Sequence, residues 1–121
     1  DGERRYKTIS MGAGFAAAVK TDGTLWTWGD NSNGQLGIGN TTNKNSPVQV
    51  GSLTDWSRIG CNSSGIRALK TDNTVWAWGA NGQGQLGLGD TTNRSSPVQV
   101  GSETDWIFVA GGAEWRAIRS S

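Results

Sequence analysis

The chain has 121 residues, a formal net charge of +1, no histidine and a single cysteine. A length of this order normally forms one domain. Because histidine is absent, the chain cannot assemble a histidine-based catalytic triad or a zinc site of the usual kind. The near-neutral charge gives no electrostatic basis for binding nucleic acid. We therefore expect a non-enzymatic protein with no catalytic residues, no metal and no cofactor.

Composition also bears on the environment of the protein. No apolar run approaches the ~18–20 residues of a membrane span, and the first 30 positions carry no secretory signal. Cys61 cannot form an internal disulfide, so nothing in the sequence requires an oxidising compartment. Tryptophan occurs seven times, and each buried indole removes roughly 150–250 Å² from water. We expect a soluble protein with a tryptophan-rich core that makes no membrane contact, and its localisation stays unassigned.

The strongest feature of the sequence is an internal repeat. Shifting the sequence by 50 positions aligns residues 21–60 with 71–110, with 25 identities over 40 positions and no gap. Weaker traces of the same unit occur at both ends of the chain. We therefore predict one partial-propeller domain over residues 1–121. Its repeat units lie approximately at 6–55 and 56–105, and a partial unit follows at 106–121.

The second unit illustrates the predicted elements in chain order. Residues 56–61 form the first strand and residues 66–70 the second, and a Thr-Asp-Asn turn follows. Residues 74–78 form the third strand, with both tryptophans on one face because side chains alternate with period two. A long glycine-rich loop leads to a short fourth strand at 97–100, where the leading proline suits a strand start or a sheet edge. No window carries a helical period.

Applied to the whole chain, this pattern predicts ten strands. The other strands begin near Tyr6, Phe15, Leu25, Pro47, Trp106 and Trp115. Four short antiparallel strands per unit are typical of a propeller blade. The fold class is therefore all-β, with antiparallel β-propeller blades and about two and a half four-stranded blades per chain.

Three motifs recur in fixed order: Asp-Gly-Thr-Leu-Trp-Thr-Trp-Gly at 22–29, Gly-Gln-Leu-Gly at 34–37 and Pro-Val-Gln-Val at 47–50. This combination resembles the repeat of the regulator of chromosome condensation family, and the resemblance extends from Tyr6 to Arg119. It implies a β-propeller, usually of seven blades, and protein partners such as small GTPases, chromatin or other enzymes. The exchange activity of the founding member depends on an inserted β-wedge. Neither 50-residue unit contains an insertion, so we do not expect that activity here.

An open stack of blades leaves an apolar face uncovered at each end. Both terminal units carry Ala, Val, Trp and Ile at core-type positions, without polar caps. Two explanations remain open: the chain belongs to a longer propeller, or several copies associate head to tail and close a ring. We expect a homo-oligomer that presents protein-binding loops on a rigid scaffold.

The motifs divide candidate residues into core and contact positions. Paired spacing in each unit predicts that six tryptophans pack the blades: Trp26, Trp28, Trp56, Trp76, Trp78 and Trp106. Loop positions that differ between matched units are candidate contacts, as are two residues near the end of the chain. These candidate partner contacts are Asp30, Lys44, Leu53, Arg94, Glu103, Trp115 and Arg116.

Several alternative functions remain. Repeated Trp, Asn and Gln side chains could stack on and hydrogen-bond sugars, which defines a lectin-like glycan-binding propeller as the second hypothesis. The segment 30–34 has oxygen ligands in the manner of a weak calcium loop, although ordinary turn chemistry explains it better. Trp115-Arg116 resembles part of the Gly-Trp-Arg-His-Thr string of plant ultraviolet-B photoreceptors. The histidine and threonine of that string are missing.

Overall fold

The computed structural model describes residues 6–82, 84, 86 and 88–101 in full, together with the backbone of two later strands. All ten elements in this part of the chain are β-strands, which confirms the predicted all-β fold. The strands are β1 (Tyr6–Met11), β2 (Phe15–Lys20), β3 (Leu25–Gly29), β4 (Lys44–Gln49), β5 (Trp56–Cys61), β6 (Gly65–Lys70), β7 (Val75–Gly79), β8 (Arg94–Gln99), β9 (Trp106–Ala110) and β10 (Arg116–Arg119).

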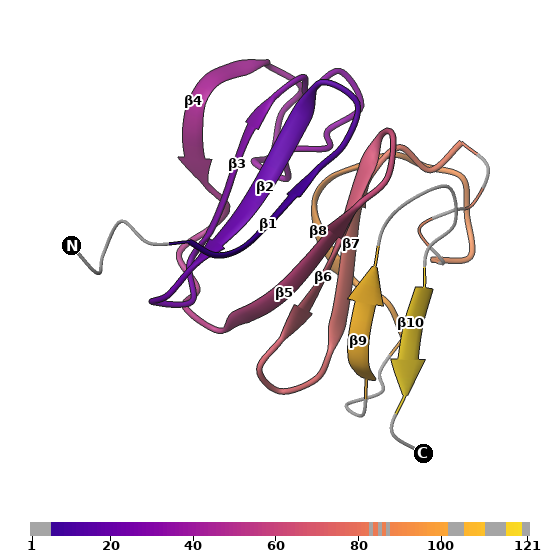
Figure 1. Ribbon diagram of the computed structural model, residues 1–121. Coiled ribbons are helices and arrows are strands. Elements are labelled where there is room, and N and C mark those ends of the chain that lie inside the picture. Colours follow the sequence, from indigo (N-terminus) through magenta and orange to yellow (C-terminus); the bar gives the residue numbers. More distant parts are fainter. Residues whose placement is uncertain are drawn as a thin grey trace.

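The strands form three antiparallel sheets in chain order (Figure 1). The first sheet has the order β1-β2-β3-β4, the second has the order β5-β6-β7-β8, and β9 pairs with β10. Each four-stranded sheet is a meander, in which every strand pairs with its neighbour in the sequence. The 50-residue repeat therefore corresponds to one complete blade.

The fourth strand of the blade differs from the sequence-based prediction. Proline was expected to begin this strand, but β8 begins at Arg94, so Pro97 lies within it. β8 is the edge strand of its sheet, and its register shifts opposite the segment that contains Pro97, between Ala77 and Gly79. At such an edge the missing proline N–H removes no essential ladder bond. The same correction applies to β4, which begins at Lys44 rather than at Pro47.

The glycine that ends the Trp-x-Trp-Gly motif is required by the backbone. Gly79 has a φ of 110°, a region that side chains rarely adopt. A Cβ atom placed there would lie 2.6 Å from the Cα atom of Gly65 and 2.7 Å from the carbonyl oxygen of Ser64. β7 can therefore end beside the start of β6 only if this position has no side chain.

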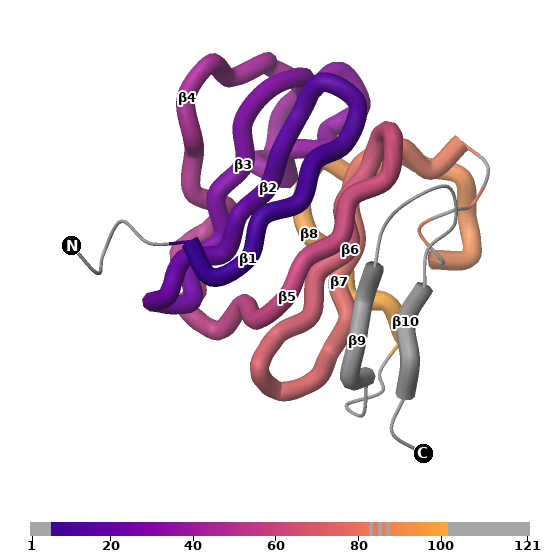
Figure 2. Tube along the Cα trace, viewed as in Figure 1, coloured from indigo at the N-terminus to yellow at the C-terminus, as the bar shows by residue number. Residues whose placement is uncertain are grey.

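The two complete sheets stack face to face, and the first strands of successive sheets lie on the same side of the stack. β1 and β2 both contact β5, and β5 and β6 both contact β9. Figure 2 shows the first and second sheets as consecutive layers of one fan. The order of the layers follows the order of the repeats, as in a propeller.

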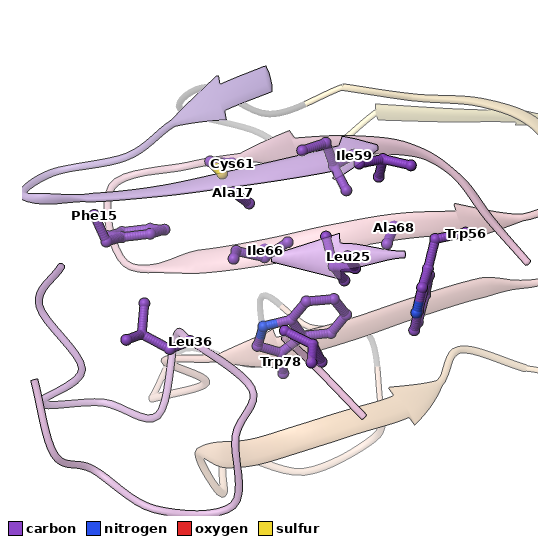
Figure 3. Packing of buried hydrophobic residues seen from close by; sticks show 12 residues of the cluster. Phe15, Ala17, Leu25, Leu36, Trp56, Ile59, Cys61, Ile66, Ala68 and Trp78 are labelled. Atoms are coloured by element: carbon purple, nitrogen blue, oxygen red, sulfur yellow. The ribbon is translucent and has the colours of Figure 1, made fainter. Parts of the chain in front are cut away.

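The hydrophobic core lies between the first and second sheets. The first sheet contributes Phe15, Ala17, Val19 and Leu25, and its long loop contributes Leu36. The second sheet faces them with the side chains of Trp56, Ile59, Cys61, Ile66, Ala68 and Trp78 (Figure 3). A hydrogen bond from backbone to side chain joins the layers as well, because the Cys61 N–H donates to Ser10 Oγ at 3.0 Å.

Candidate protein-binding surfaces

The Asp-x-Thr-x-Trp part of the repeat forms a hydrogen-bonded chain at the hairpin between the second and third strands. In the second sheet, Trp76 Nε1 donates to Thr74 Oγ1 at 2.8 Å, and that hydroxyl donates to Asp72 Oδ1 at 2.6 Å. The Thr74 N–H donates to the same carboxylate oxygen. These bonds favour the charged form, so they hold the pKa of Asp72 below its usual value. The chain fixes the orientation of the Trp76 ring.

A lysine covers the indole that this chain positions. Lys70 Nζ lies 4.0 Å from the centroid of the Trp76 ring and 5.0 Å from that of Trp56. Lys20 Nζ lies 4.2 Å from the Trp26 ring in the first sheet. Such cation–π contacts strengthen where the ammonium is partly removed from water. Lys70 is only 8% exposed, whereas Lys20 is half-buried.

Buried asparagines fold the glycine-rich loops. Asn31 Nδ2 donates to the carbonyl oxygens of Asn40 and Thr42, and Asn31 Oδ1 accepts from the Leu36 N–H. Asn81 makes the equivalent bonds in the second unit. The side chain of Asn31 is therefore fully engaged in ordinary loop structure. No cluster of metal-ligating acidic, cysteine or histidine side chains occurs among the described residues.

The loop that Asn31 organises packs on the second sheet. Gly37 has a φ of 71°, and a Cβ atom there would lie 2.6 Å from Trp78 Nε1. Two residues after the motif, Gly39 donates its N–H to the carbonyl oxygen of Ser95 at 2.7 Å. The Gly-Gln-Leu-Gly motif thus joins neighbouring blades, a role that requires the close approach only glycine permits.

An open groove of about 500 Å³ lies beside this junction. The first repeat supplies Ile38, Val48, Val50 and Leu53, and the second supplies Trp56, Lys70, Trp76, Ser96 and Pro97. The volume falls in the range of small-ligand sites. Both walls belong to this chain, so the groove is complete without a further blade.

The outer face of the first sheet is the second candidate surface. Register and alternation place Tyr6, Ile9, Met11, Trp26 and Trp28 on the side of this sheet opposite to the core. Tyr6, Ile9 and Met11 are 39%, 56% and 74% exposed. This is an exposed apolar surface, of a kind that usually marks an interaction site.

The tryptophans predicted to pack the blades divide into two groups. Trp56 and Trp78 are buried between the sheets, and their ring centroids lie 5.8 Å apart in an edge-to-face arrangement. Trp26, Trp28 and Trp76 are half-buried. The side chain of Trp106 lies outside the described residues.

The predicted partner contacts do not form one cluster. Lys44 and Arg94 pair with Gly29 and Gly79, so with Asp30 they lie at one rim of the sheets. Leu53 lies near the opposite rim, in the connection between β4 and β5, and lines the groove. The side chains of Glu103, Trp115 and Arg116 lie outside the described part of the chain.

Electrostatics separate these positions further. Arg94 forms an ion pair with Asp90 at 2.8 Å, and this bond lowers the pKa of the Asp90 carboxyl. Asp30 Oδ1 accepts a hydrogen bond from the Ser32 N–H. Both side chains thus have local partners that any incoming protein must displace or share.

Sequence reasoning missed Lys20 and Lys70. A signal was available, because both lysines recur at the 50-residue spacing, directly before the turn. The register pairs Ala68 with Trp76, which places Lys70 diagonally across from Trp76 on the same face. The contact of Lys70 with the Trp76 ring identifies Lys70 as the charged residue in the groove lining.

Four-stranded antiparallel sheets, repeated at a fixed spacing and stacked face to face, define the chain as a β-propeller repeat protein. A sequence model of the "Regulator of chromosome condensation (RCC1) repeat" matches residues 22–65 and 72–115, and a second model with the same description matches residues 6–35. The chain therefore belongs to the regulator of chromosome condensation repeat family, which confirms the resemblance in the motifs.

Curated relatives match over less than half of the chain. The X-linked retinitis pigmentosa GTPase regulator of dog is 48% identical over 48 residues, which is 40% of this chain and 5% of the relative. The human protein of the same name is 43% identical over 56 residues, covering 45% of this chain and 6% of the relative. The human E3 ubiquitin-protein ligase HERC2 is 38% identical over 58 residues, which is 46% of this chain and 1% of the relative. The chain thus corresponds to a small part of each relative.

Solved structures match the whole fold. Human WBSCR16 superposes with a TM-score of 0.84 at 24% identity, covering 100% of this chain and 33% of that one. Yeast RCC1 (Prp20), solved bound to Kap60, superposes with a TM-score of 0.83 at 17% identity. The match covers 96% of this chain and 30% of that one. The chain therefore has the size of about a third of these proteins.

No helix among the described residues is long and apolar enough to cross a membrane.

Proposed function

We propose that the chain is a non-enzymatic scaffold for protein binding that completes its propeller by self-association, with the outer face of the first sheet covered by a sheet from a second copy. The observation that supports this proposal is a contrast between equivalent positions. Ile59 and Cys61 are buried against the first sheet, whereas Ile9 and Met11 are largely exposed.

In the second sheet, the face that carries Ile59 and Cys61 is covered by the first sheet. Phe15, Ala17, Val19 and Leu25 of the first sheet pack on Ile59, Cys61 and their neighbours. Because the outer face of the first sheet carries residues of similar character at the same register, it suits the same kind of cover. Burying one large aliphatic side chain contributes about 1.5–3 kcal/mol. A head-to-tail contact of this type closes into a ring when the rotation per copy permits.

Known proteins with this fold support a role in protein binding. One yeast structure is described as RCC1 (Prp20) bound to Kap60, and another concerns the binding of Prp20p to Gsp1p and histones. The glycan-binding alternative has less support. One face of Trp26 and of Trp76 is already covered by a lysine, and Trp78 is fully buried.

Light scattering coupled to gel filtration, over a range of protein concentrations, tests the self-association. We expect oligomers that shift toward monomer on dilution. Met11→Asp should shift the chain to monomer, because it places a charge on the outer face of the first sheet. Thr41→Asp adds the same charge at an exposed position of the loop between β3 and β4 and should leave the oligomers intact.

Two results would overturn the self-association proposal. The first is a monomer throughout the micromolar range. The second is an oligomer that withstands Met11→Asp while the variant retains the strand content of the parent by circular dichroism.

A further inference from the structure

The groove between the first and second sheets has an apolar wall on each side. Ile38, Val48 and Val50 line it from the first repeat, and Trp76 and Pro97 line it from the second. Its position differs from that of the outer face of the first sheet, so the two surfaces can be occupied at the same time. A short chain segment with apolar side chains matches such walls.

One charged group lies in this apolar lining. Lys70 is 8% exposed, and its ammonium rests over two indole rings. The groove lining contains no carboxylate, and Lys70 forms no ion pair with any residue that the structure describes. The Asp72 carboxylate attracts this ammonium electrostatically without forming an ion pair with it. A cation that is largely removed from water and forms no ion pair among the described residues favours an anionic partner, because a charge-assisted hydrogen bond is strong in such surroundings.

We propose that this groove binds an acidic peptide segment in which an aliphatic side chain adjoins a carboxylate. The carboxylate accepts a hydrogen bond from the Lys70 ammonium, and the aliphatic side chain packs between Val48 and Pro97. This inference rests on the proposed role in protein binding and adds the chemistry of the partner.

The groove is organised before a partner arrives. Trp76 is fixed by its bond to Thr74 and through that hydroxyl to Asp72. The opposite wall is joined to β8 by the hydrogen bond from Gly39 to Ser95. A site held in this way loses little conformational entropy on binding, which favours affinity.

Fluorescence anisotropy with labelled hexapeptides tests the proposal on the full chain. The probe is Ser-Glu-Leu-Glu-Leu-Ser, with Ser-Gln-Leu-Gln-Leu-Ser and Ser-Glu-Gly-Glu-Gly-Ser as matched controls. We expect saturable binding of the probe and at least about tenfold weaker binding of each control, since one control lacks the charge and the other lacks the apolar side chains. Equal binding of all three peptides would overturn the proposal.

Variants assign the binding to the groove. Lys70→Met keeps the aliphatic stem and should weaken the probe about tenfold, whereas Lys70→Arg should retain binding. Lys7→Met makes the same change at an exposed position of β1 and should have no effect. Leu53 is 46% exposed, so Leu53→Asp can fold normally and should weaken the acidic probe, while Leu53→Lys should strengthen it. Equal affinities for the Asp and Lys variants would contradict the proposed site.

The outcomes separate this inference from self-association. If the chain stays monomeric but binds the probe through Lys70, the self-association proposal is overturned and the groove proposal is supported. A chain that associates without Lys70-dependent binding does the reverse. Saturable binding of neutral sugars, with no binding of the probe, would overturn the acidic-peptide proposal and support the glycan-binding alternative.

Discussion

The two complete sheets follow the same repeat pattern in different surroundings. Position 59 is an isoleucine with 7% exposure, and position 9 is an isoleucine with 56% exposure. The Asp-Thr-Trp hydrogen bonds, by contrast, recur in both sheets with the same partners. Interactions within a blade are therefore set by the repeat, whereas burial between blades depends on the neighbour. Substitutions of residues that act within a blade should therefore have similar effects on stability in both sheets, whereas substitutions between blades should not.

The largest expected contrast concerns the second tryptophan of the Trp-x-Trp motif. Trp78 is fully buried between the sheets, whereas Trp28 is half-buried on the outer face of the first sheet. Trp78→Ala should lower the free energy of unfolding by about 3–5 kcal/mol because it leaves a cavity in the core. Trp28→Ala should cost clearly less, since solvent can fill the space. Urea unfolding of both variants provides the measurement.

The dependence of these costs on protein concentration tests the comparison further. If a second copy covers Trp28, the cost of Trp28→Ala should rise as the protein is concentrated, while the cost of Trp78→Ala should not. Equal costs for the two variants in dilute solution would show that the first sheet is covered within a single chain.

The sequence made the repeated part of this structure predictable. Strand number, order and pairing follow from period-two alternation, turn residues and the 50-residue spacing, all of which are local signals. The core role of Trp78 also follows from the motif. The half-buried state of its equivalent Trp28 does not, because the same pattern is more or less buried according to what lies beside it.

The candidate sites were less predictable. Comparing the units selected Leu53, which does line the groove, together with Asp30 and Arg94, which lie at the other rim. Lys70 was not selected because it is the same in both units as Lys20, and the comparison considered only residues that differ. A comparison of differing residues therefore cannot select a residue that is identical in both units. Lys70 and Lys20 are distinguished by their burial, which the structure reveals. The early start of β8 depends on edge pairing, which Pro97 alone does not reveal.

The two sulfur atoms at equivalent positions offer a chemical contrast. Burial raises the pKa of the Cys61 thiol to about 11 from an ordinary 9.0. The thiolate fraction near pH 8 therefore falls about a hundredfold, and the thiol is also shielded. Native Cys61 should resist a disulfide reagent until the chain unfolds, whereas Met11, which is 74% exposed, should oxidise readily in dilute peroxide.

Mass spectrometry of both modifications, with and without urea, checks this contrast. The raised pKa also means that Cys61 contributes to stability below pH 9 and that the contribution is lost as the pH rises toward 11. Rapid labelling of Cys61 in the native chain would contradict the packing between the sheets. Slower oxidation of Met11 at higher protein concentration would support the cover proposed for the outer face.

The smallest expected effect should be the same in the two sheets. Hydrogen bonds from Thr24 and Thr74 lower the pKa values of Asp22 and Asp72. A carboxyl with a lowered pKa stabilises the fold above its ordinary value near 3.8, and this contribution is lost as the pH falls through the lowered value. Asp22→Asn and Asp72→Asn should each reduce stability at pH 7 and approach the parent at pH 2. Thermal unfolding across this range measures both. Because these bonds lie within one hairpin, the two losses should match, and a marked inequality would show that neighbouring blades influence even the interactions inside a blade.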